Sequence, residues 1–191
     1  METNSVTSGS IQSFLQKNVK SMRFLVKIGA LLVLWKLAFF FIWRSPDLLH
    51  AYNEFSLFVI DLLLHASGGI MSFFGEEIEL DNALRIIRIK GTVGVTVGEP
   101  CIGFEIDALF LALVFSSAGK LMNKLWFSII GLTVLVFVNI ARIMTLAYLV
   151  EINPWLWEMN HKFVFSIVVY SVLFFLWHLW IQKFSKVHCY K

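Results

Sequence analysis

The chain has 191 residues, of which 58% are hydrophobic, 16% aromatic and only 15% charged, and its mean hydropathy is +0.76. An ordinary soluble domain carries about 25% charged residues, so this composition excludes that class and predicts that most of the chain contacts membrane lipid. The net charge of +3 is spread along the chain and is not gathered on one stripe, which argues against nucleic acid as a partner.

The membrane domain is expected to extend over residues 24–182, between two cytoplasmic tails at 1–23 and 183–191. Four stretches within it reach the length of about 20 mostly apolar residues that a membrane-spanning helix needs. They are residues 24–43, 102–119, 125–149 and 161–182. No small-residue cleavage site accompanies the first stretch, which indicates a retained helix and not a signal peptide.

Residues 47–74 form a further apolar stretch, but with one polar side. Written at about 100° per residue, its polar positions fall within a wedge of about 60° on one helix face. They are Asp47, His50, Glu54, Asp61, His65 and Gly68. A helix divided in this way can lie in the membrane interface without crossing it.

The distribution of positive charge favours the interfacial position for residues 47–74. Lysine and arginine near the ends of spans mark the cytoplasmic side. Basic residues precede the first span, Lys120 and Lys124 occupy the loop between the second and third, and three lysines follow the last. All these groups can be cytoplasmic only if residues 47–74 do not cross the membrane.

Residues 76–98 change to the period of a strand. Alternating valines occupy positions 93, 95 and 97, and turn signals stand at Asp81-Asn82 and Lys90-Gly91. We therefore expect a small β-hairpin or meander outside the membrane. Pro100 suits a first helical position, so Cys101 is expected to open the next span.

These segments together predict an all-α multi-spanning membrane protein. It would have about four transmembrane helices, one interfacial amphipathic helix and a small extracytoplasmic β-hairpin.

Three polar side chains that are unusual for their setting are expected to approach one point on the outer side. Cys101 stands at the outer end of the second span, His161 at the outer end of the fourth, and Arg142 within the outer third of the third. Arg142 precedes Leu149 by about 10 Å of helix, and a long side chain can cover much of that distance by extending toward the interface.

Cys101 is a candidate nucleophile, because a thiolate attacks where a thiol does not and a helix N-terminus or nearby cation favours the thiolate. His161 would take its proton near neutral pH, with His50 and His65 as rival bases. The alternative is that Cys101 is a small buried apolar residue, as free cysteines usually are. Gly103 favours function, since it lets a substrate backbone or a neighbouring helix come close.

Arg142 is the strongest single signal in the sequence. An arginine inside a span costs at least about 2.5 kcal/mol, so it needs a compensating partner. Its rigid fork of donors suits an oxyanion, a carbonyl or a carboxylate, and Asn139 on the same helix face adds an amide donor. The alternative is a tether between helices, in which Arg142 pairs with Glu105 or Asp107.

The remaining polar groups have plainer interpretations. Lys36, inside the first span, is interpreted as a lysine that extends to the interface. Cys101 and Cys189 are expected on opposite sides of the membrane, which excludes a disulfide between them. The sequence contains no metal-ligand cluster, phosphate-binding loop or Cys-x-x-Cys pair, so we expect neither a metal nor another cofactor.

Three segments carry a resemblance to a known family. GEPCIGFEIDALFLAL places a Cys-x-Gly at the head of a helix, VNIARIMTLAYL places an Asn-x-x-Arg late in the next span, and NHKFVFSIVVY begins with the histidine that opens the following one. In this order and at these helix ends the motifs resemble those of the exosortase/archaeosortase family, over residues 45–182.

The resemblance implies a cysteine protease or transpeptidase in the bacterial or archaeal cell (inner) membrane, with its active site facing outside. Such an enzyme recognises a C-terminal sorting signal on secreted proteins and cleaves it through a thioester. It then transfers the new C-terminus to a surface acceptor, a polysaccharide or a lipid. The implied partners are membrane lipid, the secreted proteins and this acceptor.

Carried over to this chain, the catalytic residues are Cys101, Arg142 and His161. The residues expected to support the site or bind substrate are Asn139, Gly103 and Glu105. The chain departs from the family pattern at Ile102, where serine is commoner, and at Phe165, near the place of a glycine.

Two other functions fit the same residues. In one, the chain is a non-catalytic assembly or transport protein, and an intramembrane pair between Arg142 and a carboxylate holds its helices together. In the other, it is a membrane protease that only hydrolyses its substrate.

Overall fold

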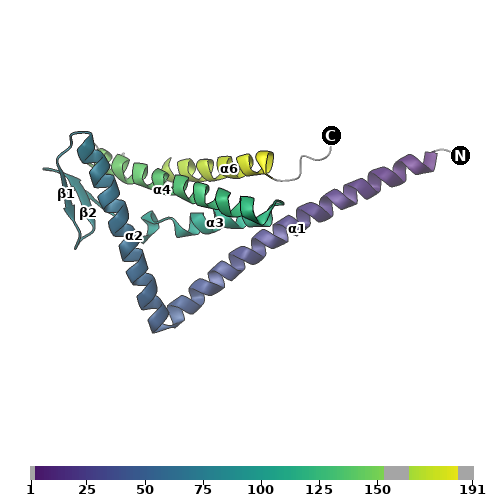
Figure 1. The fold of residues 1–191 in the computed structure, drawn as a ribbon, viewed down its shortest axis with the longest axis horizontal. Coiled ribbons are helices and arrows are strands. Elements are labelled where there is room, and N and C mark those ends of the chain that lie inside the picture. Colours follow the sequence, from purple (N-terminus) through teal and green to yellow (C-terminus); the bar gives the residue numbers. More distant parts are fainter. Residues whose placement is uncertain (1–2, 153–163, 185–191) are drawn as a thin grey trace.

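The computed structural model describes residues 3–152 and 164–184 (Figure 1). Two long helices, α1 and α2, come first; a small sheet and a short 3₁₀ helix, η1, follow, and then helices α3, α4 and α6. Their bounds are α1 Thr3–Arg44, α2 Pro46–Phe73, β1 Ile78–Asp81, β2 Ile86–Ile89, β3 Val95–Thr96, η1 Glu99–Cys101, α3 Phe104–Ser116, α4 Leu121–Ile152 and α6 Phe165–Lys183.

Within the described part of the chain, four helical segments are long and apolar enough to cross a membrane. They are Ser21–Arg44, Pro46–Phe73, Leu121–Val150 and Phe165–Lys183. This is an all-α multi-spanning architecture with a small sheet, as the composition predicts. The segment Pro46–Phe73 qualifies by length although we expected it in the interface, and the span expected at 102–119 contains only the 13-residue α3. The segment expected as an N-terminal tail is helical from Thr3 onward.

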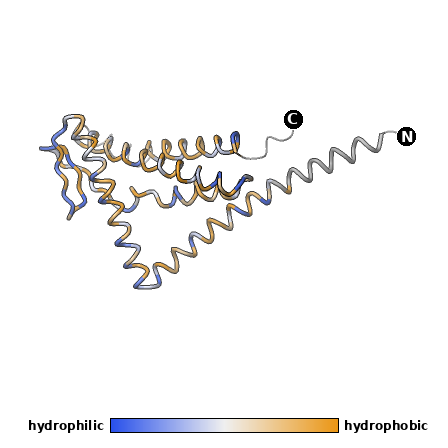
Figure 2. Tube along the Cα trace, viewed as in Figure 1, coloured by the Kyte–Doolittle hydropathy of each residue, from blue (hydrophilic) through white to orange (hydrophobic). Residues whose placement is uncertain are grey.

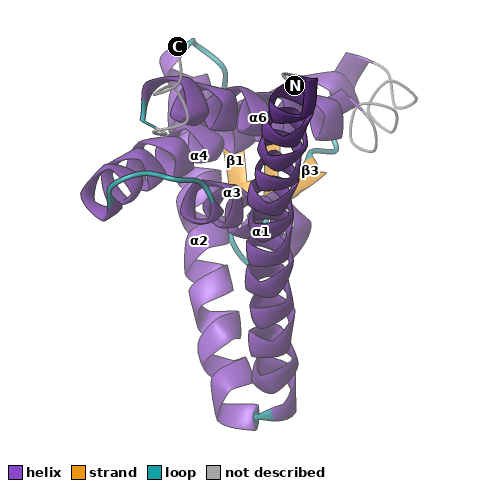
Figure 3. Ribbon diagram, turned by 90° about the vertical axis from the view of Figure 1, so that its right-hand side faces the viewer, coloured by secondary structure: helices purple, strands orange, loops and turns teal. Residues whose placement is uncertain are grey.

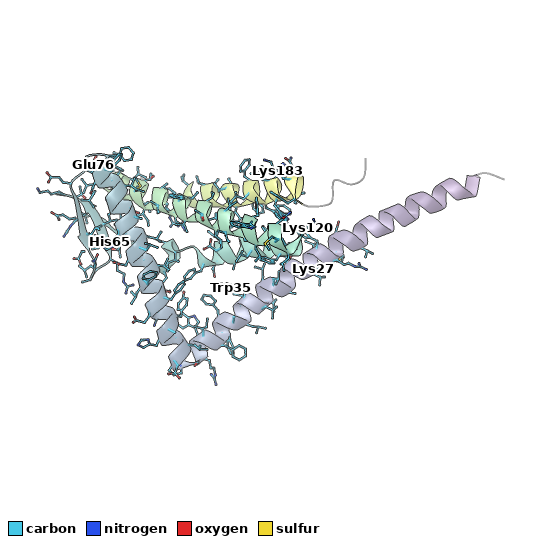
Figure 4. All side chains as sticks on the ribbon, in the orientation of Figure 1. Lys27, Trp35, His65, Glu76, Lys120 and Lys183 are labelled. Carbon is cyan, nitrogen blue, oxygen red and sulfur yellow. The ribbon has the colours of Figure 1, made fainter. Side chains whose placement is uncertain are left out.

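The charged residues separate the two ends of the helices. Figure 4 shows Lys27, Lys120 and Lys183 at the end remote from the sheet, whereas His65 and Glu76 lie at the sheet end. The tube in Figure 2 is mostly hydrophobic along the helices between these ends. The chain thus has a basic end and an end that carries the sheet, on either side of an apolar layer.

Helix α2 lies steeply across the direction of α4 and α6, as the two views in Figures 1 and 3 show. Ser45, between α1 and α2, has an extended conformation. Pro46 then begins α2 at a position where its missing N–H is tolerated. The chain therefore turns sharply at this point, and α1 and α2 diverge from the corner.

The side chains of α2 divide into three groups. One group is buried and packs in the apolar cluster between α2, α4 and the sheet, for example Leu63, Leu64 and Met71. A second is polar and exposed, and includes the pair of Asp61 and His65, whose Oδ1 and Nδ1 are 3.3 Å apart. A third is apolar and exposed, and includes Phe55, Phe58, Leu62 and Phe73. Gly68, which we placed on the polar wedge, is instead buried against Leu80 and Ile78 of β1.

The sheet confirms the expected meander. Its strands pair antiparallel in the order β1-β2-β3, with Ile78 opposite Ile89 and Ile87 opposite Val95. Of the three alternating valines, Val95 and Val97 are buried, whereas Val93 lies before β3 and is exposed. The sheet is also tied to α4, since Tyr148 Oη donates a hydrogen bond to Glu76 Oε1 at 3.4 Å.

Two apolar clusters hold the helices together. One lies at the sheet end and includes residues of α2, the sheet, the 3₁₀ helix and α4; the other joins α3, α4 and α6 toward the basic end. In the second cluster Phe110 of α3 lies against Gly131 of α4, where an added Cβ would be 2.2 Å from the ring. Helices α3 and α4 approach this closely because Gly131 has no side chain.

Candidate functional site

Cys101 lies in a short turn and not at the start of the next span, so our expectation for its position is wrong. Residues Glu99–Cys101 form a 3₁₀ helix, and α3 begins only at Phe104. Between them stands Gly103 with φ +84°, a left-handed conformation that interrupts the helix. The first turn of α3 therefore begins after the cysteine, and the thiol of Cys101 does not lie at the N-terminus of α3.

The Cys-x-Gly and Asn-x-x-Arg motifs are in direct contact. Asn139 Nδ2, buried in α4, donates a hydrogen bond to the carbonyl oxygen of Ile102 at 3.1 Å. A Cβ added at Gly103 would lie 2.8 Å from the same Nδ2. Gly103 thus provides both the left-handed conformation and the space that let α4 hold the cysteine turn.

We expect Gly103→Ala to lower the free energy of unfolding by about 1–3 kcal/mol, because alanine is strained at this φ and clashes with Asn139. The measurement is the thermal unfolding midpoint of the purified chain in detergent. Gly69→Ala in α2 is the matched control: the position is helical and an added Cβ meets nothing within 4 Å, so it should be neutral or stabilising by up to about 1 kcal/mol. Equal midpoints for the two variants would contradict this account of Gly103.

Beside the cysteine turn there is a cleft of about 480 Å³. Residues of α1, α2, α3, α4 and α6 line it, together with Glu99 and Gly103 on either side of Cys101. Phe39 and Tyr52 form part of its aromatic wall, with ring centroids 5.4 Å apart. The cleft therefore lies where the described helices meet, near the sheet.

Arg142 lines this cleft, at the point where α4 meets the start of α6. Its Nε is buried and has no hydrogen-bond partner in the described part of the chain. The guanidinium carbon lies 5.8 Å from the centroid of the Phe165 ring at the start of α6, a cation–π distance. A guanidinium in this state retains its hydrogen-bonding capacity for an anion or carbonyl in the cleft.

Glu105, one of the two carboxylates considered as a tether for Arg142, is paired elsewhere. Its Oε1 lies 2.6 Å from Lys36 Nζ in α1. Among the described residues, neither Glu105 nor Asp107 forms an ion pair with Arg142. These two carboxylates therefore do not tether Arg142 in this structure.

Cys101 is buried at the edge of the cleft. The residue is 5% exposed and belongs to the apolar cluster at the sheet end, and it is not among the described residues that line the cleft. Its neighbours Glu99 and Gly103 do line it. The thiol therefore faces the protein interior in this conformation, one residue away from positions that face the cleft.

The third member of the expected set, His161, lies outside the described residues. The next described helix along the sequence is α6, whose first residue, Phe165, has its ring centroid 5.8 Å from the guanidinium carbon of Arg142. The rival bases His50 and His65 are exposed on α2.

The structure adds cleft residues that the sequence did not single out. Phe39 and Tyr52 are aromatic residues of apolar helices, and nothing local distinguishes them from others in the chain. Phe165 carried a signal, since it stands near a place where the resembled family has glycine. No sequence signal indicated the pairing of Lys36, because its partner is 69 positions away.

In the part of the chain that is described, no three His, Cys, Asp or Glu side chains are grouped so as to hold a metal ion. No protein-family model, curated protein or solved structure matches the chain. The function is therefore argued from the geometry of the cleft and from the motifs.

Proposed function

We propose that this chain is a membrane cysteine peptidase or transpeptidase of the exosortase type, which cleaves a C-terminal sorting signal from secreted proteins. The observation that carries the proposal is the guanidinium of Arg142 in the wall of the cleft, beside a turn that contains Cys101; its buried Nε has no hydrogen-bond partner among the described residues. An arginine within a span is costly unless it has a use. Here the use is to bind the substrate carbonyl and the charge that develops on it.

The topology proposed for the chain places the cleft at the outer boundary of the membrane. The basic end with Lys27, Lys120 and Lys183 is assigned to the cytoplasm by the positive-inside rule. With α4 and α6 across the membrane, α2 lies steeply to them and has three groups of side chains, which suit protein, water and lipid. This division supports an interfacial α2, and in the proposed topology the sheet lies outside.

The reaction begins with attack of the Cys101 sulfur on the scissile carbonyl carbon, while His161 accepts the thiol proton. The carbonyl oxygen becomes an oxyanion that Arg142 stabilises. When the carbon–nitrogen bond breaks, His161 returns the proton to the leaving amine, which departs with the signal helix. A thioester to Cys101 remains.

The second half restores the enzyme. The hydroxyl or amine of a surface acceptor, or water, attacks the thioester carbon, the carbon–sulfur bond breaks, and the thiolate regains a proton through His161. The product is an ester or amide with an acceptor, or a free acid with water. To start this cycle the buried thiol must turn into the cleft, and the turn that carries it is flanked by Gly98 and Gly103.

The test is to co-express the full chain with a tagged secreted protein that ends in a candidate motif, a transmembrane helix and a basic tail. We expect removal of the tail, and a covalent adduct to the chain that hydroxylamine releases, because hydroxylamine cleaves thioesters. Mass spectrometry of the product C-terminus then separates transfer from hydrolysis. If no adduct and no shortened product form while both proteins reach normal levels, the proposal is overturned.

A further inference from the structure

The most unusual contact outside the catalytic set is an ion pair in the apolar layer. Lys36 stands between Lys27 and Arg44, about 12–14 Å of helix from each of these charged residues. It is therefore near the middle of the first span, where a lysine is costly unless it is compensated. We interpreted it from the sequence as a side chain that extends to the interface, and the structure instead gives it a partner.

That partner, Glu105, is well placed to accept it. Lys36 Nζ donates a hydrogen bond to Glu105 Oε1 at 2.6 Å, although the two side chains are 68% and 77% exposed on the protein surface. Glu105 lies in the first turn of α3, where the helix dipole favours a negative charge. With lipid and not water around them, the two groups depend on each other for compensation.

The pair connects α1 to the cleft. Glu105 lines the cleft, and so does Phe39, one turn after Lys36 on α1. The most apolar part of α1 contains no buried residue. Its described ring contacts with other helices are a stack of Phe24 on Trp177, with centroids 5.9 Å apart, and the contact of Phe39 with Tyr52. The ion pair lies between these two contacts, so it holds the middle of α1 against the start of α3.

We propose that Lys36 is a positioning residue. Through Glu105 it holds α1 as the lipid-side wall of the cleft, and this wall receives the apolar, membrane-embedded segment of the substrate beside its scissile bond. The role in substrate binding rests on the proposed function. The role in holding α1 does not depend on it.

The first measurement is the yield of folded, monodisperse chain in detergent for four variants. Lys36→Met and Glu105→Gln each leave one charge without its partner, and we expect each to lower the yield on the order of 10-fold. The double variant K36M/E105Q removes both charges and should regain most of it, as should the exchanged pair K36E/E105K. Lys27→Met, at the basic end of the same helix, is the control, and its effect should simply add to that of Glu105→Gln. If the effects of Lys36→Met and Glu105→Gln on the yield also add, the ion pair does not hold α1.

The second measurement separates positioning from stability. For a membrane-anchored substrate we expect Lys36→Met, which alters no residue that lines the cleft, to raise KM about 5- to 10-fold with kcat within about 2-fold, and K36E/E105K to restore KM. A short peptide with the same scissile bond and no membrane segment should show the wild-type KM with Lys36→Met. If the wild type is active but KM for the anchored substrate is unchanged, α1 does not act as the wall that receives the membrane segment of the substrate. An inactive wild type instead overturns the proposed function, and the yields still decide whether Lys36 holds α1.

Discussion

Replacement of Cys101 by alanine or serine is expected to abolish removal of the substrate tail, with a loss of at least about 1000-fold. Alanine has no nucleophile, and the serine hydroxyl is far less ionised than a thiol near neutral pH, so no acyl intermediate accumulates. The measurement is the ratio of full-length to shortened substrate in cells, read from the tag, with the adduct to the chain assayed in parallel. Both should disappear together.

Cys189→Ala is the matched control, because Cys189 is the only other cysteine of the chain. It should leave processing unchanged. The buried position of Cys101 also predicts that a thiol reagent labels it slowly in the absence of substrate. Normal processing by both Cys101 variants, at normal protein levels, would mean that Cys101 is a buried apolar residue and that the chain is no cysteine peptidase.

Replacement of Arg142 by alanine is expected to lower kcat about 100- to 1000-fold, as removal of an oxyanion donor does in other acyl-transfer sites. Arg142→Lys should be nearly as inactive, because an ammonium keeps the charge but lacks the rigid fork. The amount of folded protein should stay at the wild-type level in both variants. The reason is that the guanidinium has no described ion pair whose loss would destabilise the helices.

The amount of protein is the measurement that distinguishes this role from a tether. If Arg142 held helices together, Arg142→Ala would lower folded abundance whereas Cys101→Ala would be silent. Arg88→Ala serves as the control, since this arginine lies on β2 and pairs with Glu79, at 3.0 Å between Nε and Oε2. Its loss should affect neither kcat nor, by more than about 1 kcal/mol, stability.

Hydropathy and residue period predicted the long helices and the sheet, because both signals are local. An apolar stretch of about 20 residues can satisfy its backbone in lipid only as a helix, and alternating valines can be buried only on one face of a strand. The same reasoning failed at residues 102–119. There a left-handed Gly103 precedes α3, and Ser117 ends it in an extended conformation, so that α3 has only 13 residues. Hydropathy does not report either backbone conformation.

The order of the motifs predicted that Cys101, Arg142 and His161 approach one point. In the structure Arg142 lines the cleft and Cys101 is buried beside it, whereas His161 lies outside the described residues. The order of the motifs could not predict the direction in which the Cys101 side chain points, because this depends on a 3₁₀ turn of three residues. Nor could it predict that Glu105 pairs with Lys36, since that contact depends on how α1 crosses α3. Arrangements of this kind are set by packing between distant segments.

The three groups of side chains on α2 have a consequence for the proposed reaction. In the proposed interfacial position α2 would contact water, acyl chains and protein along its length, and it could not shift along the membrane normal without moving aromatic rings into water or carboxylates among the acyl chains. In that position it would set the level of the cleft relative to the phosphate groups of the outer leaflet. In a thicker or thinner bilayer we expect α4 and α6 to change tilt, while peptide bonds continue to be cut at a constant distance from the lipid headgroups.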